Sequence, residues 1–157
     1  MYMYKNKNSI HTICMIKNFF TCGIVGWCLE ILFTAWHSLK RQDYKLMGNT
    51  SLWMFPIYGM AALLSPLSIF LKKKPVFFRG CVYTFFIFLT EFVSGKFLKK
   101  RGVCPWNYDH SKYNIDGVIR LDYAPLWFCT GLLYEFILKL PLKSTEDKFT
   151  STGKNSL

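Results

Sequence analysis

Apolar residues in this chain gather into four long blocks that are separated by shorter polar segments. The blocks follow neither the period of two typical of a half-buried strand nor the one-sided pattern of a surface helix. A helix needs about 20 mostly apolar residues to cross a membrane. The pattern therefore predicts four transmembrane helices, over residues 13–36, 52–71, 80–98 and 123–140.

These blocks predict an all-α fold, a polytopic four-helix membrane bundle formed by residues 1–140 with a structured polar loop between the third and fourth helices. Pro56 and Pro66 are expected to kink the second helix rather than end it, as membrane helices tolerate. The fourth block is the weakest, so three crossings with one interfacial helix are the alternative. Residues 141–157 are polar and predicted to form a disordered tail.

Composition supports a membrane protein. Hydrophobic residues make up 52% of the chain and charged residues 18%, whereas soluble domains have about 25% charged residues. Disordered chains, disulfide scaffolds and small soluble enzymes are therefore excluded. The net charge is +11, but the basic residues lie between the blocks, where they would contact anionic headgroups. We expect the lipid bilayer, and not nucleic acid, as the partner of these charges.

The basic loops also predict an orientation in the cell membrane. Four crossings place both termini on one side, which carries 11 Lys and Arg residues against 9 on the other side. The Lys72–Lys74 cluster lies with the termini, and the positive-inside rule places this side in the cytoplasm. A cleaved signal peptide is the alternative for the first block. That block contains Glu30 and has no small-residue cleavage site, which favours a retained helix.

Polar residues fall at one depth in the four predicted helices. Glu30 lies about 9 Å and Glu91 about 10 Å below the outer ends of their helices, at 1.5 Å per residue. Tyr58 and Thr130 reach the same level. Since a carboxylate in hydrocarbon costs at least about 2.5 kcal/mol, it is expected to face a partner or a wet cavity. These four residues and Trp27 form the candidate binding set.

Two interpretations of this layer stay open. Small residues accompany each carboxylate at helical spacing, and such stripes let membrane helices pack closely. The stripes are Gly23, Gly26, Glu30 and Thr34 in the first helix, and Thr84, Phe88, Glu91 and Gly95 in the third. Either each carboxylate bonds a neighbouring helix, or the pair forms a substrate or ion site. Two neighbouring carboxylates would share a proton, which favours a proton-coupled or cation-accepting site. Glu135 lies four residues before Lys139 and predicts an interfacial ion pair.

The segment between the third and fourth helices is the second candidate region. Lys99 to Gly102 is typical of a helix end with a glycine cap. The Asn114–Gly117 sequence predicts a turn before a short β-branched run. This segment either lids the outer mouth of the bundle or lies as an amphipathic loop at the interface. The candidate lid residues are Trp106, Asn107, Tyr108, Asn114, Asp116, Gly117 and Arg120.

Metal, cofactor and nucleophile chemistry find little support in the sequence. Six cysteines are present without a C-x-x-C motif, and five of them lie in or beside apolar blocks. His37 and His110 lack a spaced carboxylate motif that would indicate a metal site. We therefore expect no metal, no cofactor and no catalytic residues.

Several motifs, in order along the chain, resemble one family. They are Gly26–Glu30, Pro56–Gly59 with Ala61 and Ala62, Glu91 with Gly95, Trp106–Tyr108, Asn114–Gly117, Arg120, and Leu126 with Trp127. Between about Phe20 and Leu140 the chain resembles the putative ABC-transporter type IV (CmpB-type) permeases, small bacterial membrane proteins. Asn107 stands where this family usually has an aspartate. The change removes one carboxylate from the loop and weakens any proposal that a charge is needed at position 107.

The resemblance implies a transporter permease whose substrate is open. The chain has no G-x-x-x-x-G-K-[ST] phosphate-binding loop, so transport would depend on a partner ATPase subunit or on a homo-oligomer. The alternatives are a structural or regulatory subunit of a membrane complex and a membrane-embedded, lipid-modifying enzyme. The sequence favours a protein that is not an enzyme.

Overall fold

Helices make up most of the computed structural model, which describes the backbone over residues 2–40 and 42–154 and the side chains over 12–40 and 42–139. The long helices are α1 (Tyr2–Lys40), α4 (Val76–Lys100) and α5 (Ala124–Lys154). Between α1 and α4 lie α2 (Met54–Gly59), the 3-10 helix η1 (Met60–Leu63) and α3 (Leu64–Phe70). The strands β1 (Asn114–Ile115) and β2 (Ile119–Arg120) and the 3-10 helix η2 (Leu121–Tyr123) precede α5.

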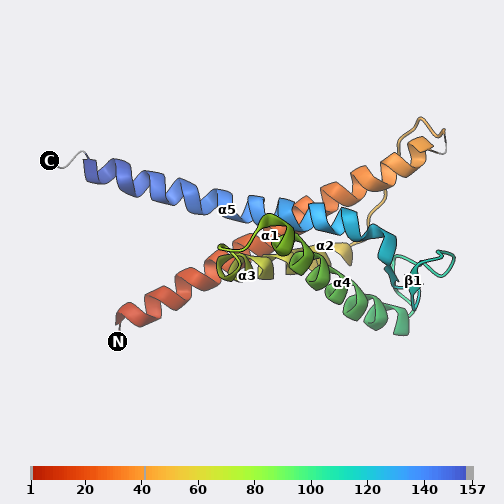
Figure 1. Ribbon diagram of the computed structural model, residues 1–157, viewed down its shortest axis with the longest axis horizontal. Helices are drawn as coiled ribbons and strands as arrows, with labels where there is room; N and C mark the ends of the chain where they lie inside the picture. Colours follow the sequence, from red (N-terminus) through yellow and green to blue (C-terminus); the bar gives the residue numbers. More distant parts are fainter. Residues whose placement is uncertain (1, 41, 155–157) are drawn as a thin grey trace.

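The long helices cross near the middle of the molecule (Figure 1). The start of α1 and the end of α5 lie at one end of the molecule, and the strand pair and the α1–α2 connection lie at the other. Helix α1 packs against α2 and η1, and α5 packs against α4 and α3. The centre of the molecule is therefore a meeting point of all the helical segments.

Two helices among the described residues are long and apolar enough to cross a membrane. The first is Thr12–Lys40, which lies within α1, and the second is α4, Val76–Lys100. Only 17% of the most apolar 18-residue stretch of each helix is buried, whereas a core helix of a soluble protein is mostly buried. Exposed side chains such as Leu32 and Phe85 cover their outer faces. Helices that are apolar all round and yet exposed fit a lipid environment. The four-crossing bundle itself stays a prediction.

The second predicted helix, 52–71, is divided into three shorter elements. The helical segment Met54–Phe70 is apolar but shorter than a typical span. Pro66 has no N–H and cannot bond the carbonyl four residues earlier. The backbone before it tightens into η1, which is how chains commonly absorb a lost helical bond. The expected kink is thus a run of 3-10 geometry.

Helix ends extend beyond the apolar blocks that predicted them. Helix α1 begins at Tyr2 rather than at residue 13, and α5 continues to Lys154 rather than ending at residue 140. Hydropathy marks the apolar stretch, whereas backbone hydrogen bonding can continue through polar residues. The backbone of the expected tail, 141–157, is helical as far as Lys154, and residues 155–157 lie outside the described part of the chain.

The core joins α1, α4 and α5 through buried aromatic side chains. Cys22, Tyr83 and Tyr134 are buried, and the Tyr134 hydroxyl donates a hydrogen bond to the Cys22 carbonyl over 3.3 Å. Gly131 allows α5 to approach α4, because a Cβ there would lie 2.6 Å from Tyr83 Cβ. These contacts fix the crossing of the three long helices.

The segment between α4 and α5 is ordered by two turns that the sequence predicts. Gly102 has a φ of +68°, and its N–H bonds the Lys99 carbonyl over 3.0 Å, so the predicted glycine cap is confirmed. Asp116 and Gly117 also have positive φ values, 52° and 67°. They close a hairpin in which Ile115 pairs with Ile119. The predicted turn and β-branched run are therefore confirmed as well.

Candidate functional site

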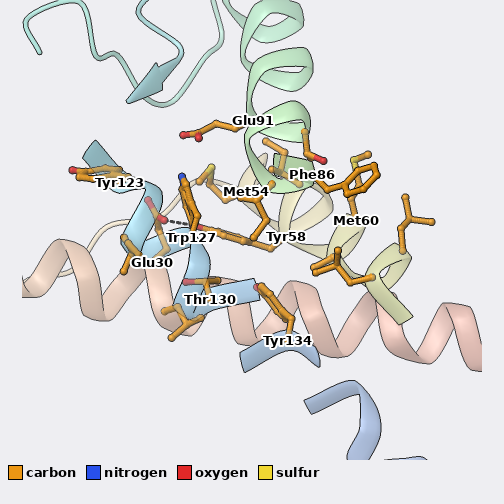
Figure 2. Close-up of a pocket in the computed structure, with 18 of the residues that line it drawn as sticks. Glu30, Met54, Tyr58, Met60, Phe86, Glu91, Tyr123, Trp127, Thr130 and Tyr134 are labelled. Atoms are coloured by element: carbon orange, nitrogen blue, oxygen red, sulfur yellow. Dashed lines mark hydrogen bonds between the residues drawn. The ribbon is translucent and has the colours of Figure 1, made fainter. Parts of the chain in front are cut away.

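A cavity of about 410 Å³ lies between the helices and the loop 101–123 (Figure 2). This volume falls within the range of small-molecule sites. Much of its wall is apolar, as at Met54, Leu64 and Phe86. Its polar and aromatic hydrogen-bonding residues are Glu30, Tyr58, Thr90, Glu91, Trp106, Tyr108, Tyr123, Trp127, Thr130 and Tyr134.

Glu30 reaches the cavity from α1 and is held by a residue of α2. The Tyr58 hydroxyl donates a hydrogen bond to Glu30 Oε2, drawn as a dashed line in Figure 2. Tyr58 can come this close because Gly26 has no side chain. A Cβ at Gly26 would lie 2.1 Å from Tyr58 Cγ. The small residue on α1 thus sets the distance between the two helices at the site.

Glu91 reaches the same cavity from α4 and is only 8% exposed. Trp127 and Tyr108 are near neighbours of its carboxylate. Even so, neither Glu91 Oε2 nor Trp127 Nε1 has a hydrogen-bond partner among the described residues. Leaving a buried polar atom unpaired costs about 1–3 kcal/mol, and native structures rarely do so. Glu91 Oε2 and Trp127 Nε1 are therefore buried polar atoms that the described side chains leave unsatisfied.

The charge of the cavity is one-sided. Glu30 and Glu91 lie close enough to interact electrostatically. None of the described residues that line the cavity is Lys, Arg or His. The cavity therefore presents two carboxyl groups and no basic side chain to balance them.

Trp27 differs from the other members of the candidate binding set. Glu30, Tyr58, Glu91 and Thr130 all line the cavity, whereas Trp27 does not. Its indole N–H donates to the Ser51 carbonyl over 3.0 Å, and its ring lies 4.9 Å from that of Phe55. Trp27 therefore ties the α1–α2 connection to α1.

Two residues of the candidate lid, Trp106 and Tyr108, line the cavity. The indole N–H of Trp106 donates to the carbonyl of buried Val118 over 3.0 Å. The side chains of Trp106 and Val118 pack over Gly95 of α4, where a Cβ would lie 2.9 Å from Val118 Cβ. Burial raises the pKa of Tyr108, so its hydroxyl stays protonated and can donate. The loop is thus seated on α4 and extends into the cavity.

The polar residues of the loop shape it without lining the cavity. Asn107 Oδ1 accepts the Asp109 N–H over 2.9 Å, and Asn114 Oδ1 accepts the Gly117 N–H over 3.1 Å. Lys99 Nζ lies 3.1 Å from Asp109 Oδ1 and lowers the pKa of that carboxyl. These interactions hold the loop against the end of α4.

Ion pairs attach the hairpin at two further points. Lys96 Nζ lies 2.7 Å from Asp116 Oδ2. Arg120 Nη2 lies 2.8 Å from Asp122 Oδ2, and Arg120 also donates to the Tyr123 hydroxyl over 3.0 Å. The Arg120 guanidinium lowers the pKa of Asp122. Arg120 thereby fixes Tyr123, which does line the cavity.

Three aromatic lining residues of η2 and α5 with hydrogen-bonding groups were not in the candidate set: Tyr123, Trp127 and Tyr134. Together with Thr130 they occupy positions i, i+4, i+7 and i+11, which is one face of a helix. This periodicity was available in the sequence. Trp127 lies three residues before Thr130 on this face.

A second buried carboxylate lies away from the cavity, on α5. The predicted pair between Glu135 and Lys139 is confirmed. Arg79 of α4 also contacts this carboxylate, with 3.2 Å between Arg79 Nε and Glu135 Oε2. The Glu135 side chain is 4% exposed, so both cations compensate a nearly buried charge.

No group of three or more His, Cys, Asp and Glu side chains that could bind a metal ion occurs among the described residues. Two exposed apolar helices of spanning length fit a membrane location.

The family model described as putative ABC-transporter type IV matches residues 17–156. The chain belongs to this family, as the motifs predicted, and the family description indicates a transport-related role at a membrane. No solved structure matches the chain.

Proposed function

We propose that this chain is a permease-like transport component that crosses the membrane four times, with both termini in the cytoplasm. The cavity binds the transported molecule, and Glu30 and Glu91 supply its charged groups. Residues 101–123 form the outer lid over this cavity. The lid residues that contact the guest are Trp106 and Tyr108.

One observation carries the proposal: carboxylates from α1 and α4 line a single cavity in which no described residue is basic. Acidic groups at membrane depth are costly and usually belong to ion or substrate pathways. A purely structural role would favour satisfied hydrogen bonds, whereas Glu91 Oε2 has no partner in the described part of the chain.

The energy for transport would come from outside this chain. The sequence has no phosphate-binding loop of the Walker type. Exposed apolar side chains on α4, such as Phe85 and Val93, offer a surface for a second copy or a membrane partner. A partner ATPase subunit or a homo-oligomer would complete the transporter.

Topology is tested by labelling single cysteines in intact cells, after replacing the six native cysteines with serine. Asp43→Cys and Asn107→Cys should react with a membrane-impermeant maleimide added outside, and Lys73→Cys should react only after the membrane is opened. Labelling of Lys73→Cys from outside would contradict the proposed orientation. Labelling of positions 43 and 107 on opposite sides would contradict four crossings.

Function is tested by deleting the gene and profiling growth of the host on a panel of nutrients and toxic compounds. The wild-type gene should reverse any altered growth. Glu30→Gln and Glu91→Gln should fail to do so while reaching the membrane in normal amount. Asp43→Asn, an exposed acid outside the cavity, is the matched control and should restore growth.

Full complementation by the Glu30→Gln/Glu91→Gln double variant would reject the binding role of the cavity. Co-purification of that variant with a stable partner would then favour a structural or regulatory subunit.

A further inference from the structure

The shape of the guest can be read from the wall around the two carboxyl groups. Eight aromatic residues line the cavity: Phe33, Tyr58, Phe86, Trp106, Tyr108, Tyr123, Trp127 and Tyr134. Aromatic faces attract cations within about 6 Å of the ring centre, most strongly where water is excluded. Rings and carboxylates in one cavity therefore favour the same sign of guest charge.

A bare metal ion fits this wall poorly. Ca²⁺ takes six to eight oxygen ligands, and Mg²⁺ requires near-ideal octahedral geometry. The carboxyl groups of the cavity come from two separate helices, and no metal-binding cluster of three or more His, Cys, Asp or Glu occurs among the described side chains. A guest that spreads its charge over an apolar body matches the rings better than a hard ion.

The wall opposite Glu30 also favours an apolar body. Met60 and Phe86 lie across the cavity from Glu30 in Figure 2. These two residues and Leu63 line the cavity and are exposed, at 44%, 41% and 57%. They come from η1 and α4, within the apolar part of the chain. This side would open toward lipid and admit a molecule that partitions into hydrocarbon.

We infer that the cavity binds an organic cation with an apolar body, such as a substituted ammonium or phosphonium ion. The Glu91 carboxylate, buried and with one oxygen unpaired, attracts the charge. Glu30 supplies the second carboxyl group, and Trp106, Tyr108 and Trp127 stack on the apolar groups. This inference rests on the proposed function, because it names the class of molecule that the transporter would carry.

Two probe ions of the same shape and opposite charge test the inference. Binding of radiolabelled tetraphenylphosphonium and tetraphenylborate is measured by equilibrium dialysis to the full chain in phosphatidylcholine nanodiscs, with empty nanodiscs subtracted. Tetraphenylphosphonium should bind saturably, and tetraphenylborate at least tenfold more weakly. Equal affinity for the two ions would overturn the inference, since a cavity that is only apolar would bind both ions equally well.

Variants then locate the binding. Glu91→Gln should weaken tetraphenylphosphonium at least tenfold, and Asp43→Asn should leave it unchanged. Glu91→Asp keeps the charge, so it should retain the preference for the phosphonium over the borate ion. Unchanged phosphonium binding in the Glu30→Gln/Glu91→Gln variant would overturn the assignment. Displacement by MgCl₂ but not by choline chloride at equal ionic strength would overturn it in favour of an inorganic ion.

The two proposals fail separately. Absent phosphonium binding together with glutamate-dependent growth would reject the organic cation and keep transport. Selective phosphonium binding together with full complementation by the double glutamine variant would keep the binding site and reject its role in transport.

Discussion

Two buried acidic regions of the molecule stand in contrast. In the cavity, Glu30 and Glu91 have no basic residue beside them among the described lining residues, and one Glu91 oxygen has no partner. Nearer the other end of α4, Glu135 contacts both Arg79 and Lys139. Arg79 precedes Glu91 by twelve residues, which is about 18 Å along the helix at 1.5 Å per residue. One chain thus contains a compensated and an uncompensated site.

This difference is the one expected between a structural charge and the binding charge that we propose for the cavity. A compensated ion pair satisfies itself, and its removal is felt by the fold. A buried carboxylate without a basic partner lowers the stability of the empty protein, and a proton or a bound cation would compensate its charge. Sites of both kinds have a buried acid, so burial by itself does not distinguish them.

The largest effect is expected at the ion-paired site. Glu135→Gln leaves the Arg79 guanidinium without its carboxylate, which should lower the free energy of unfolding by about 3 kcal/mol. Glu91→Gln is the matched variant at the unpaired site and should cost no stability. Unfolding of both proteins by SDS titration in detergent micelles, followed by circular dichroism, measures the difference. Equal destabilisation by the two variants would remove the contrast.

Steric change at the cavity should come next. Gly26→Ala places a Cβ against the Tyr58 ring and should lower stability by about 2 kcal/mol, the usual range for overpacking. It should also separate Tyr58 from Glu30 and weaken phosphonium binding. Cys28→Ala, at an exposed position two residues away, is the control and should change neither property. Unaltered stability and binding in Gly26→Ala would show that α1 and α2 do not need this close approach.

Removing one hydroxyl should have a smaller effect. Tyr58→Phe deletes the donor to Glu30 and should cost about 1.5 kcal/mol, as for a hydrogen bond to a charged group. The exposed Tyr113→Phe is the control and should be neutral. The same SDS titration measures both variants. A neutral Tyr58→Phe would indicate that the empty cavity leaves Glu30 as free of protein partners as Glu91 Oε2.

The smallest effect is expected in the loop, at acid pH. Lys99 lowers the pKa of Asp109 below its ordinary value of 3.8. The folded loop therefore gains stability from this charge above pH 3.8, and the gain is lost as the pH falls through the lowered pKa. Trp106 fluorescence should report loosening of the loop below about pH 3.8. Asp109→Asn should remove this step, and an unchanged step would assign it to another group.

Much of the architecture could be predicted because it depends on local pattern. The apolar blocks marked the helices, and the Asn114–Gly117 sequence marked the hairpin turn, since both signals depend on neighbours along the chain. Depth along the helices also brought Glu30 and Glu91 to one level. The breaking of the second helix into α2, η1 and α3 was less accessible, because a proline can kink or tighten a helix depending on its packing.

Contacts between segments distant in sequence account for the rest. Trp27 belongs to the same sequence motif as Glu30. Its indole N–H nevertheless donates to the Ser51 carbonyl, and Trp27 does not line the cavity. The indole of Trp127, on α5, lines the cavity with Glu30 instead. A helical position gives a direction only once the rotation of the helix about its axis is known, and packing sets that rotation.

The amino-acid sequence by itself determined the helical class and the family and predicted one common level for Glu30 and Glu91, because these follow from hydropathy, motif order and the rise of a helix. The tertiary structure decided which acids are neutralised. Arg79 lies 56 residues before Glu135 in the chain, and only the packing of α4 on α5 brings the pair to 3.2 Å. The same packing leaves Glu91 beside aromatic rings, since charge compensation in a folded chain depends on distance in space.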